Sequence, residues 1–344
     1  MKLINTVDAV GHVLCHDMTQ IIPGQFKGPA FKKGHIVTKE DIPVLLSIGK
    51  QRLYVWEKDE NMLHEDEAAQ ILFEICAGGN MHPTGVSEGK IELIADCDGL
   101  LKLDRDRLRA VNMLGEMMIA TRHGDTPVKK GDKLAGTRVI PLVIEKEKME
   151  RAKEAGGGVP LLHILPYTVK KAAVLTTGSE VYSGLIEDKF TPVIEKKLQE
   201  YGVEVVFHEV FDDNPKALTD GCLRAIRAGA EIVLCTGGMS VDPDDRTPLA
   251  IKNTGARVVT YGAPVLPGAM FMLAYYDTEG RTVPIAGLPG CAMYAKRTIF
   301  DLVLPRLLAV DEVRAEELAA LGEGGLCLSC TVCTYPNCGF GKGH

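Results

Sequence analysis

The segment TGGMSVDPDDRTP, residues 236–248, combines residue types that bind ligands of opposite charge. Its two glycines follow the apolar run EIVLC and suit a backbone whose N–H groups approach an anion. Its three aspartates bring negative charge, which a loop built only for phosphate would not carry. The segment therefore indicates a polar ligand site with a mixed charge balance.

The elements that must position this segment begin near residue 169, where strand-like and helix-like segments alternate. Strands with their following loops are predicted over residues 170–180, 203–211, 231–238 and 281–290, and helices over residues 187–202, 212–230 and 291–309. This order predicts a parallel sheet with right-handed crossovers. Ligands of such sheets bind beyond the carboxyl ends of the strands.

Two further polar loops fall on that edge of the predicted sheet. They are TTGSEVYSG, residues 176–184, and FDDNP, residues 211–215. In any single loop, turns and helix caps explain these residue types, but three such loops on one edge favour a binding site. The fingerprint G-x-G-x-x-G is absent after Leu175, which disfavours an NAD-binding domain.

The motifs resemble the molybdopterin-binding domain shared by the adenylyltransferase and the molybdenumtransferase of molybdenum-cofactor synthesis. The resemblance rests on S-G-x-x-x-D-K after the first strand, T-G-G-x-S with a later D-x-T-P, and the turns VLPGAM and AGLPGCAM. It covers residues 170–310 and implies a three-layer α-β-α domain with a mainly parallel sheet.

By position, the resemblance implies two catalytic acids, Asp245 and Asp212. It also implies that the pterin and its phosphate are held by Thr177, Gly178, Ser179, Glu180, Ser183, Gly184, Asp188, Thr236, Gly237, Gly238, Ser240, Pro289 and Gly290. Both enzyme branches use Mg2+, and the candidate ligands here are Asp242 and Asp245, because carboxylate oxygens suit this cation. Glycine N–H groups and hydroxyls would then hold phosphate, while aspartates hold the cation that offsets its charge.

The chain departs from the molybdenumtransferase pattern at three places. Asp242-Pro243 stands where that pattern has Gly-Asp, and Cys291-Ala292 follows GLPG instead of Asn-Pro. The lysine expected near the P-G turn is replaced by Leu266 or Ala269. The first loops are closer to the adenylyltransferase and the later turns to the molybdenumtransferase, which describes a divergent member.

Residues 1–165 predict an α+β accessory region that precedes the molybdopterin-binding domain at residues 166–310. Small β modules are predicted over residues 21–37 and 126–144, and helices over residues 40–49 and 65–79. Residues 145–160 are charged and then glycine-rich, which predicts a solvated connection or a frayed helix end between the domains.

The last predicted part, residues 311–344, is a linker and a cysteine-rich tail. Cys327, Cys330, Cys333 and Cys338 give C-x2-C-x2-C-x4-C after the flexible lead LGEGG. These spacings let four thiolates converge on one metal centre. The first three cysteines resemble an iron–sulfur run, but the final gap and the residue after it differ, so an iron–sulfur cluster and Zn2+ both stay open.

Composition excludes several classes of protein. The chain of 344 residues is 46% hydrophobic with a formal net charge of −7, which is typical of a globular protein and argues against a nucleic-acid partner. Its apolar stretches are too short to span a bilayer, and its start lacks the apolar core of a secretory signal. We therefore expect a cytoplasmic protein without a membrane partner.

The resemblance implies a transferase of molybdenum-cofactor synthesis. Such an enzyme would bind molybdopterin, or its adenylylated form, and insert molybdate with Mg2+ assistance. The alternatives are a molybdopterin adenylyltransferase, a non-catalytic carrier or sensor that contacts a molybdoenzyme partner, and a phosphohydrolase or amidase acting on nucleotides. The expected small-molecule partners are a pterin phosphate and a nucleotide, and related proteins assemble as homo-oligomers.

Overall fold

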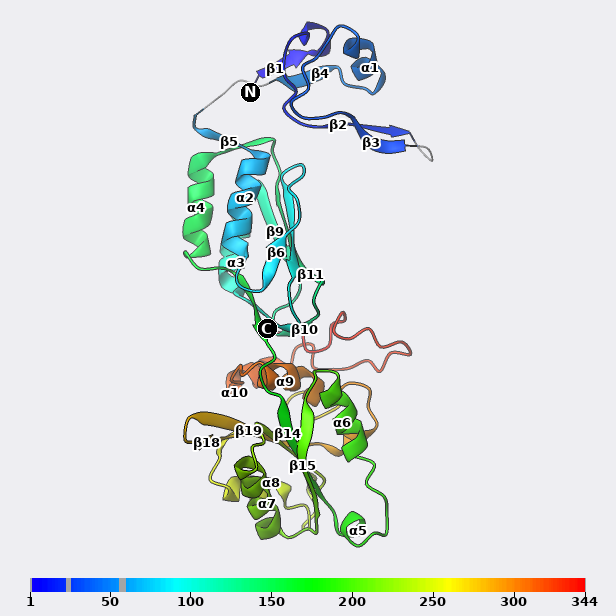
Figure 1. The fold of residues 1–344 in the computed structure, drawn as a ribbon, viewed down its shortest axis with the longest axis vertical. Helices are drawn as coiled ribbons and strands as arrows, with labels where there is room; N and C mark the ends of the chain where they lie inside the picture. The colour runs from blue at the N-terminus through cyan, green and yellow to red at the C-terminus, as the bar shows by residue number, and fades with distance from the viewer. Residues whose placement is uncertain (1, 23–25, 56–59, 344) are drawn as a thin grey trace. The chain divides into compact units, whose positions relative to one another are not determined.

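The computed structural model describes residues 2–22, 26–55 and 60–343, which form two compact units (Figure 1). The first unit comprises Met1–Cys97, Leu103–Gly124 and Lys130–Ile164, and the second comprises Asp98–Lys102, Asp125–Lys129 and Leu165–His344. Residues 23–25 of the predicted β module at 21–37, and the last residue of the predicted tail, lie outside the described residues.

The first unit is α+β, built from several small antiparallel sheets. Its strands are β1 (Lys2–Asn5), β2 (Met18–Ile22), β3 (Phe26–Phe31), β4 (Arg52–Val55), β5 (Met62–His64), β6 (Met81–Pro83), β7 (Lys90–Ala95), β9 (Met117–Thr121), β11 (Lys133–Val139) and β12 (Val143–Glu145). Its helices are α1 (Asp41–Ser47), α2 (Glu65–Cys76), α3 (Arg105–Asn112) and α4 (Lys146–Gly156), with a 3-10 turn at Thr6–Asp8. The predicted helices at 40–49 and 65–79 are confirmed as α1 and α2.

Helix α4 corrects the prediction of a solvated connection over residues 145–160. Met149 and Ala152 are fully buried on one face of this helix, and α4 packs against α2 and α3. The charged residues occupy its other face, so α4 is an amphipathic helix and is not exposed to solvent on all sides. The helix ends at Gly157, whose φ of 71° is the left-handed conformation of a glycine helix stop.

The second unit is built on a six-stranded sheet in the order β15-β14-β16-β19-β18-β17. The strands are β14 (Lys171–Thr177), β15 (Glu204–Phe211), β16 (Ile232–Thr236), β17 (Arg257–Tyr261), β18 (Met272–Thr278) and β19 (Arg281–Leu288). The first four strands in spatial order run parallel. Strand β18 pairs antiparallel with β19, and β17 pairs antiparallel with β18, so the predicted mainly parallel sheet is confirmed. Three short strands form a separate sheet in the order β10-β8-β13: β8 (Gly99–Leu103), β10 (Thr126–Val128) and β13 (Leu162–Pro166).

Helices cover both faces of this sheet, as the alternation of buried strand residues shows. Val174 and Leu234 pack in one core with α6 (Thr191–Gln199) and α9 (Ile299–Leu308). Leu175 and Cys235, the next residue on each strand, pack in the other core with α7 (Pro215–Arg227) and α8 (Thr247–Asn253). Successive strand residues point to opposite faces, so the unit has the predicted α-β-α layers (Figure 1).

Two helices of this unit begin later than predicted. Residues 187–190 precede α6, because Asp188 accepts hydrogen bonds from the N–H groups of Phe190 and Thr191 and so caps the helix from outside it. The predicted helix at 291–309 begins only at Ile299, where Thr298 and Asp301 form a capping box. Ahead of it lies a separate 3-10 turn, Gly290–Met293.

The C-terminal segment is more ordered than the predicted linker and flexible lead. It contains α10 (Ala315–Ala320), and Leu318 and Phe340 are buried in the core beneath α9. In LGEGG, Gly325 is buried, and a side chain there would lie 2.4 Å from the carbonyl oxygen of Leu321. The glycines therefore permit close backbone packing, and the expectation of a flexible lead is wrong.

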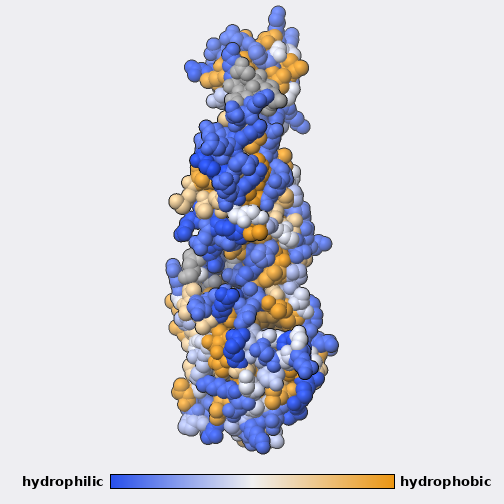
Figure 2. Space-filling view, turned by 90° about the vertical axis from the view of Figure 1, so that its left-hand side faces the viewer, coloured by the Kyte–Doolittle hydropathy of each residue, from blue (hydrophilic) through white to orange (hydrophobic). Residues whose placement is uncertain are grey.

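Every helix in the described part of the chain is too short or too polar to cross a membrane. Figure 2 shows hydrophobic residues in small groups among hydrophilic ones over the face in view. Exposed apolar side chains scattered among polar ones are normal on a protein surface.

The second unit contains a buried charge cluster that we expect to be important for stability. The Asp301 carboxylate, 4% exposed, accepts hydrogen bonds from Lys197 Nζ at 2.5 Å and from Arg297 at 2.9 Å. Asp301→Ala would leave the buried Lys197 ammonium unpaired, so we expect the free energy of unfolding to fall by about 3–5 kcal/mol. Urea denaturation followed by circular dichroism measures this loss.

The matched control is Glu200→Ala, because Glu200 pairs with the same Arg297 at 3.8 Å but is half exposed. That change should cost no more than about 1 kcal/mol. Equal losses for the two variants would contradict the importance assigned to Asp301.

Candidate ligand site at the carboxyl edge of the sheet

The polar loops predicted from the sequence do lie at one edge of the sheet. They follow β14 at Thr177, β15 at Phe211 and β16 at Thr236. These strands are parallel neighbours, and Thr176 lies opposite both Val210 and Thr236. The first two loops are also joined directly, because the Gly178 N–H donates to the Phe211 carbonyl at 3.2 Å.

Four buried threonines connect the ends of β14 and β16 to the start of α8. The Thr236 hydroxyl donates to that of Thr176 at 3.1 Å, and the Thr177 and Thr247 hydroxyls are 3.2 Å apart. Thr247 also donates to the carbonyl of Gly237 at 2.9 Å. Buried hydroxyls with satisfied hydrogen bonds fix the geometry of the backbone that they contact. The network therefore positions the loops but leaves its own hydroxyls engaged.

The two glycines after β16 are required by close contacts. Gly237 and Gly238 have φ angles of 81° and 56°, in the left-handed region. A Cβ atom would lie 2.1 Å from the Thr177 carbonyl oxygen at Gly237, and 2.7 Å from the Thr247 hydroxyl at Gly238. Within the described chain, no hydrogen bond uses the N–H groups of Gly238 or Met239. These two groups can therefore donate to an anion.

The loop after β14 is attached to the loop after β15 through Asp213. The carboxylate of Asp213 accepts hydrogen bonds from the Ser179 N–H at 3.1 Å and from the Ser179 hydroxyl at 2.6 Å. Ser179 begins α5 (Ser179–Tyr182), and Ser183 ends that turn by donating to the Ser179 carbonyl at 2.7 Å. Glu180 and Gly184 lie exposed in the same segment.

Asp245 lies partly buried in the loop after β16. Its carboxylate accepts a hydrogen bond from the Ser240 N–H at 3.0 Å, and its own N–H donates to the carbonyl of Asp242 at 3.0 Å. Burial raises the pKa of Asp245 above its ordinary value, against the effect of the Ser240 hydrogen bond, and the charges of Asp242, Asp213 and Asp244 raise it further. The site thus collects negative charge that has no cationic partner among these groups.

Two of the predicted site residues have structural roles in the fold. Asp188 accepts hydrogen bonds from the Thr176 hydroxyl at 3.1 Å and the Thr191 hydroxyl at 2.6 Å, in addition to capping α6. Burial acts to raise its pKa, but these hydrogen bonds hold it below the ordinary value. Asp212 forms a turn by accepting from the Asn214 N–H at 3.3 Å. Asp213, its neighbour, is the carboxylate of this loop that contacts the loop after β14 through Ser179.

The remaining predicted residues lie at the end of β19, beside the loop that follows β16. Thr236 pairs with Leu288 in the parallel ladder, so Pro289 and Gly290 continue at the same edge of the sheet. Pro289 is buried and accepts a hydrogen bond from the Ala292 N–H at 2.9 Å, whereas Gly290 is exposed. The structure therefore brings every loop of the predicted pterin site to this edge.

The sequence interpretation missed two charged residues of the site, Asp213 and Arg246. A small pocket between the loops is lined by Thr177, Asp212, Asp213, Asn214, Pro215, Leu218, Arg246 and Thr247. Arg246 is exposed there and supplies a cation that phosphate recognition can use. The doubled aspartate in FDDNP was the available signal for Asp213, but only the hydrogen bonds to Ser179 distinguish it from Asp212.

Metal-binding groups are not preassembled at this edge. Among the described residues, only His64, Glu65 and Asp66 of the first unit bring three ligand atoms within 4.8 Å of one another. Lys33 Nζ lies there already, 3.1 Å from His64 Nδ1 and 2.7 Å from Asp66. Mg2+ normally needs only one or two protein carboxylates together with substrate phosphates. Asp245, Asp213 and the exposed Asp242 suit that mode of binding.

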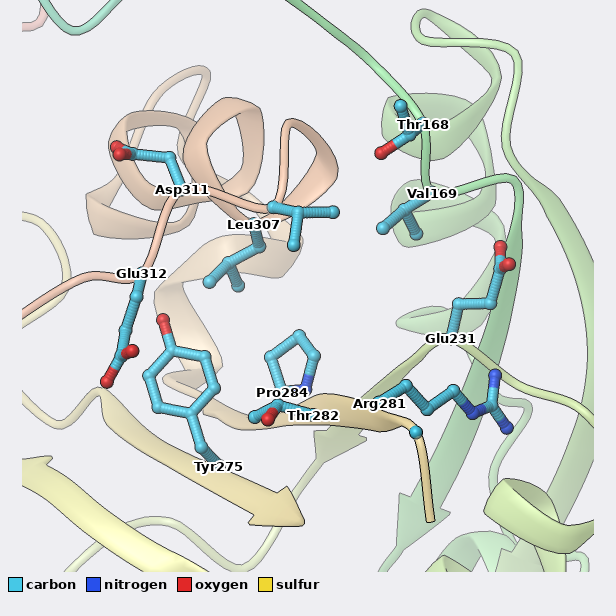
Figure 3. Close-up of a pocket in the computed structure, with 12 residues that line it drawn as sticks. Thr168, Val169, Glu231, Tyr275, Arg281, Thr282, Pro284, Leu307, Asp311 and Glu312 are labelled. Atoms are coloured by element: carbon cyan, nitrogen blue, oxygen red, sulfur yellow. The ribbon is translucent and has the colours of Figure 1, made fainter. Parts of the chain in front are cut away.

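A larger cavity of about 470 Å3 lies at the opposite edge of the sheet, near the amino ends of β14, β16 and β19 (Figure 3). Its charged side chains are already paired: Glu231 accepts from backbone N–H groups, Arg281 donates to the Ile226 carbonyl, and Asp311 pairs with Arg306. Its position and its engaged charges make it a poorer candidate than the carboxyl edge.

Comparison with known proteins finds one family match in each unit. Residues 173–309 match the family model described as "Probable molybdopterin binding domain". Residues 173–309 of this chain are therefore similar to the molybdopterin-binding family. Residues 3–57 of the first unit match a second model, described as a domain of unknown function.

Curated relatives of the molybdopterin-binding domain match over part of their length. A molybdopterin molybdenumtransferase of Nostoc sp. is 26% identical over 178 residues, which are 50% of this chain and 40% of the relative. A molybdenum cofactor biosynthesis bifunctional protein of Synechococcus elongatus is 32% identical over 85 residues, 25% of this chain and 27% of the relative. A Bacillus subtilis protein named "Putative competence-damage inducible protein" is 34% identical over 88 residues, 26% of this chain and 21% of the relative. This chain therefore spans less than half the length of each relative.

Solved structures similar to the chain include two from Pyrococcus furiosus. The tungsten cofactor synthesizing protein MoaB has a TM-score of 0.36 and 20% identity, over 42% of this chain and 99% of that chain. A molybdenum cofactor biosynthesis protein has a TM-score of 0.25 and 13% identity, over 90% of this chain and 63% of that chain.

The raised pKa of Asp245 predicts that its ionised carboxylate lowers the stability of the folded chain at neutral pH. The folded chain holds the Asp245 proton more tightly than the unfolded chain does, so this contribution to stability is lost as the pH rises through its pKa. Asp245→Asn keeps the acceptor for the Ser240 N–H and removes the charge. We expect a higher melting temperature at neutral pH, with the gain shrinking toward acidic pH.

Thermal unfolding of the wild type and the variant across this pH range measures the effect. Asp220→Asn, an exposed aspartate of α7, is the matched control and should leave the melting temperature unchanged. A lower melting temperature for Asp245→Asn at neutral pH would show that the carboxylate is stabilising.

Proposed function

We propose that the molybdopterin-binding domain binds molybdopterin, or its adenylylated form, and inserts molybdate with Mg2+ assistance. One observation carries the proposal: free N–H groups and uncompensated carboxylates meet at one edge of the sheet. Gly238 and Met239 supply the N–H groups, and Asp213 and Asp245 supply the carboxylates. A phosphate ligand with a divalent cation is complementary to this arrangement.

The phosphate of the pterin would be held by the segment from Thr236 to Ser240. The left-handed glycines turn the backbone so that its N–H groups are available, and the threonine network fixes that turn. Arg246 lines the neighbouring pocket and would pair with a second phosphate of the adenylylated form. The exposed Tyr182, Leu185 and Ile186 in the loop after β14 provide apolar surface for the pterin ring.

The cation would be held by Asp245, with Asp213 and Asp242 beside it. Burial raises the pKa of Asp245, and the charges of Asp242 and Asp213 raise it further, a charge pattern that a divalent cation relieves. Bound Mg2+ would neutralise charge that develops on the phosphoryl oxygens during transfer. The protein groups contribute by orienting these oxygens and by fixing the carboxylates through the Ser179 and Ser240 hydrogen bonds.

A second candidate, a carrier or sensor without turnover, is favoured by one specific departure. Asp242-Pro243 occupies the place of Gly-Asp in the molybdenumtransferase pattern, which alters the loop next to Asp245. Such a carrier would deliver the finished cofactor to a molybdoenzyme. An anaerobic assay with two arms separates the readings, one with adenylylated molybdopterin, molybdate and Mg2+ and the other with molybdopterin and Mg-ATP. Insertion releases AMP from the adenylylated pterin in the first arm, adenylyl transfer releases pyrophosphate from ATP in the second, and a carrier releases neither.

Asp245→Asn and Asp213→Asn should each lower turnover on the order of 10²-fold or more, the size typical of losing one electrostatic contact to a transition state. The readout is AMP release in the anaerobic assay. Asp212→Asn tests the catalytic role that the sequence gave to Asp212. It should lower turnover less, because that carboxylate accepts a hydrogen bond within a turn.

The matched control is Asp244→Asn, an exposed aspartate of the same loop, which should retain wild-type turnover. Wild-type turnover in both Asp245→Asn and Asp213→Asn would refute the catalytic assignment.

A further inference from the structure

We propose that Cys327, Cys330, Cys333 and Cys338 form a four-thiolate metal site on a loop that the molybdopterin-binding domain holds closed. The chemistry is thiolate coordination of Zn2+ or of an iron–sulfur cluster. The inference does not rest on the proposed function, because it uses residues outside the ligand site.

The two ends of the cysteine segment are joined by the fold. The Gly341 N–H donates to the Gly324 carbonyl at 3.0 Å, so the residues between them form a closed loop that includes all four cysteines. The entry is fixed a second time, because Leu266 donates to Gly325 and accepts from the Cys327 N–H, both at 2.8 Å. A Cβ at Gly341 would lie 2.4 Å from the Leu302 side chain, so the exit is packed directly on α9.

The second half of the loop is anchored in the core. The Tyr335 hydroxyl donates to the Asp301 carbonyl at 2.8 Å, and the Arg297 guanidinium lies 5.0 Å from the centre of the Tyr335 ring. Phe340 is only 5% exposed. Cys327 and Cys338, near the two ends, pack partly buried against the same core. Two of the four thiols are therefore held in place by the fold itself.

The middle of the loop has no comparable support. Cys330 and Cys333 are exposed, and so are Leu328 and Val332 at 77% and 75%. In the described chain, no backbone–backbone hydrogen bond is donated between residues 328 and 336. The centre of the loop is exposed and is held by fewer contacts than its ends, and metal coordination by its cysteines would order it further.

Basic groups surround the exposed thiols. Arg297 lies close to Cys333, and Lys296 Nζ donates to the Thr331 carbonyl at 3.0 Å.

The sulfur atoms are not yet gathered into a coordination sphere. Within the described residues, no three of them come within 4.8 Å of one another. We therefore infer that the centre of the loop closes when metal binds, while Cys327 and Cys338 keep their positions. This places Cys330 and Cys333 as the mobile ligands.

Metal analysis of the full chain purified without oxygen tests the site. We expect either zinc, or iron together with inorganic sulfide and visible charge-transfer absorption, and either result supports the site and identifies its metal. The double variant Cys330→Ser, Cys333→Ser should lose that metal, since it removes both mobile ligands. Thermal unfolding should show a lower melting temperature after the metal is removed from the wild type.

The matched control is Cys97→Ser, a partly buried cysteine of the first unit, which should retain the metal. The proposal is overturned if the wild type, reconstituted with Zn2+ or with Fe2+ and sulfide, holds no more metal than the double variant. Because Asp245→Asn should keep its metal, failure of the metal site and failure of the proposed function are distinguishable.

Discussion

The ligand site depends on how closely the backbones of β14 and β16 approach each other where they end. At Gly237 the approach leaves no space for a side chain, since a Cβ would lie 2.1 Å from the Thr177 carbonyl oxygen. The contact makes the loops after both strands share one set of buried hydroxyls, which reaches α8 through Thr247. Once these hydroxyls are satisfied within the fold, the free N–H groups of Gly238 and Met239 are what the loop offers to a ligand.

The site carries negative charge that the groups hydrogen-bonded to its carboxylates do not neutralise. Asp213 and Asp245 are held in place by hydrogen bonds from Ser179 and Ser240. Burial nevertheless raises the pKa of Asp245, and the charge of Asp213 raises it further. A protein selected only for stability would not keep such a pair unpaired. Under the proposed function, the segment TGGMSVDPDDRTP would bind the anion at its first turn and the cation at its second turn.

Much of this arrangement could be predicted from the sequence, because the strands of the second unit are apolar runs with glycine and aspartate directly after them. The choice between Asp212 and Asp213 could not, since both follow the same strand and only the contact with Ser179 decides it. Helix α4 was missed because its many charges hide a narrow buried face around Met149. The order of the C-terminal segment was missed because its glycines signal flexibility in sequence but allow close packing in the fold.

The central claim is that phosphate and cation are bound together at this edge. Anaerobic calorimetric titration of molybdopterin into the protein, with and without Mg2+, tests it most directly. The account predicts that Mg2+ tightens binding of the pterin to the wild type and has no effect on the double variant Asp213→Asn, Asp245→Asn. Equal affinity for the pterin with and without Mg2+ in the wild type would contradict it.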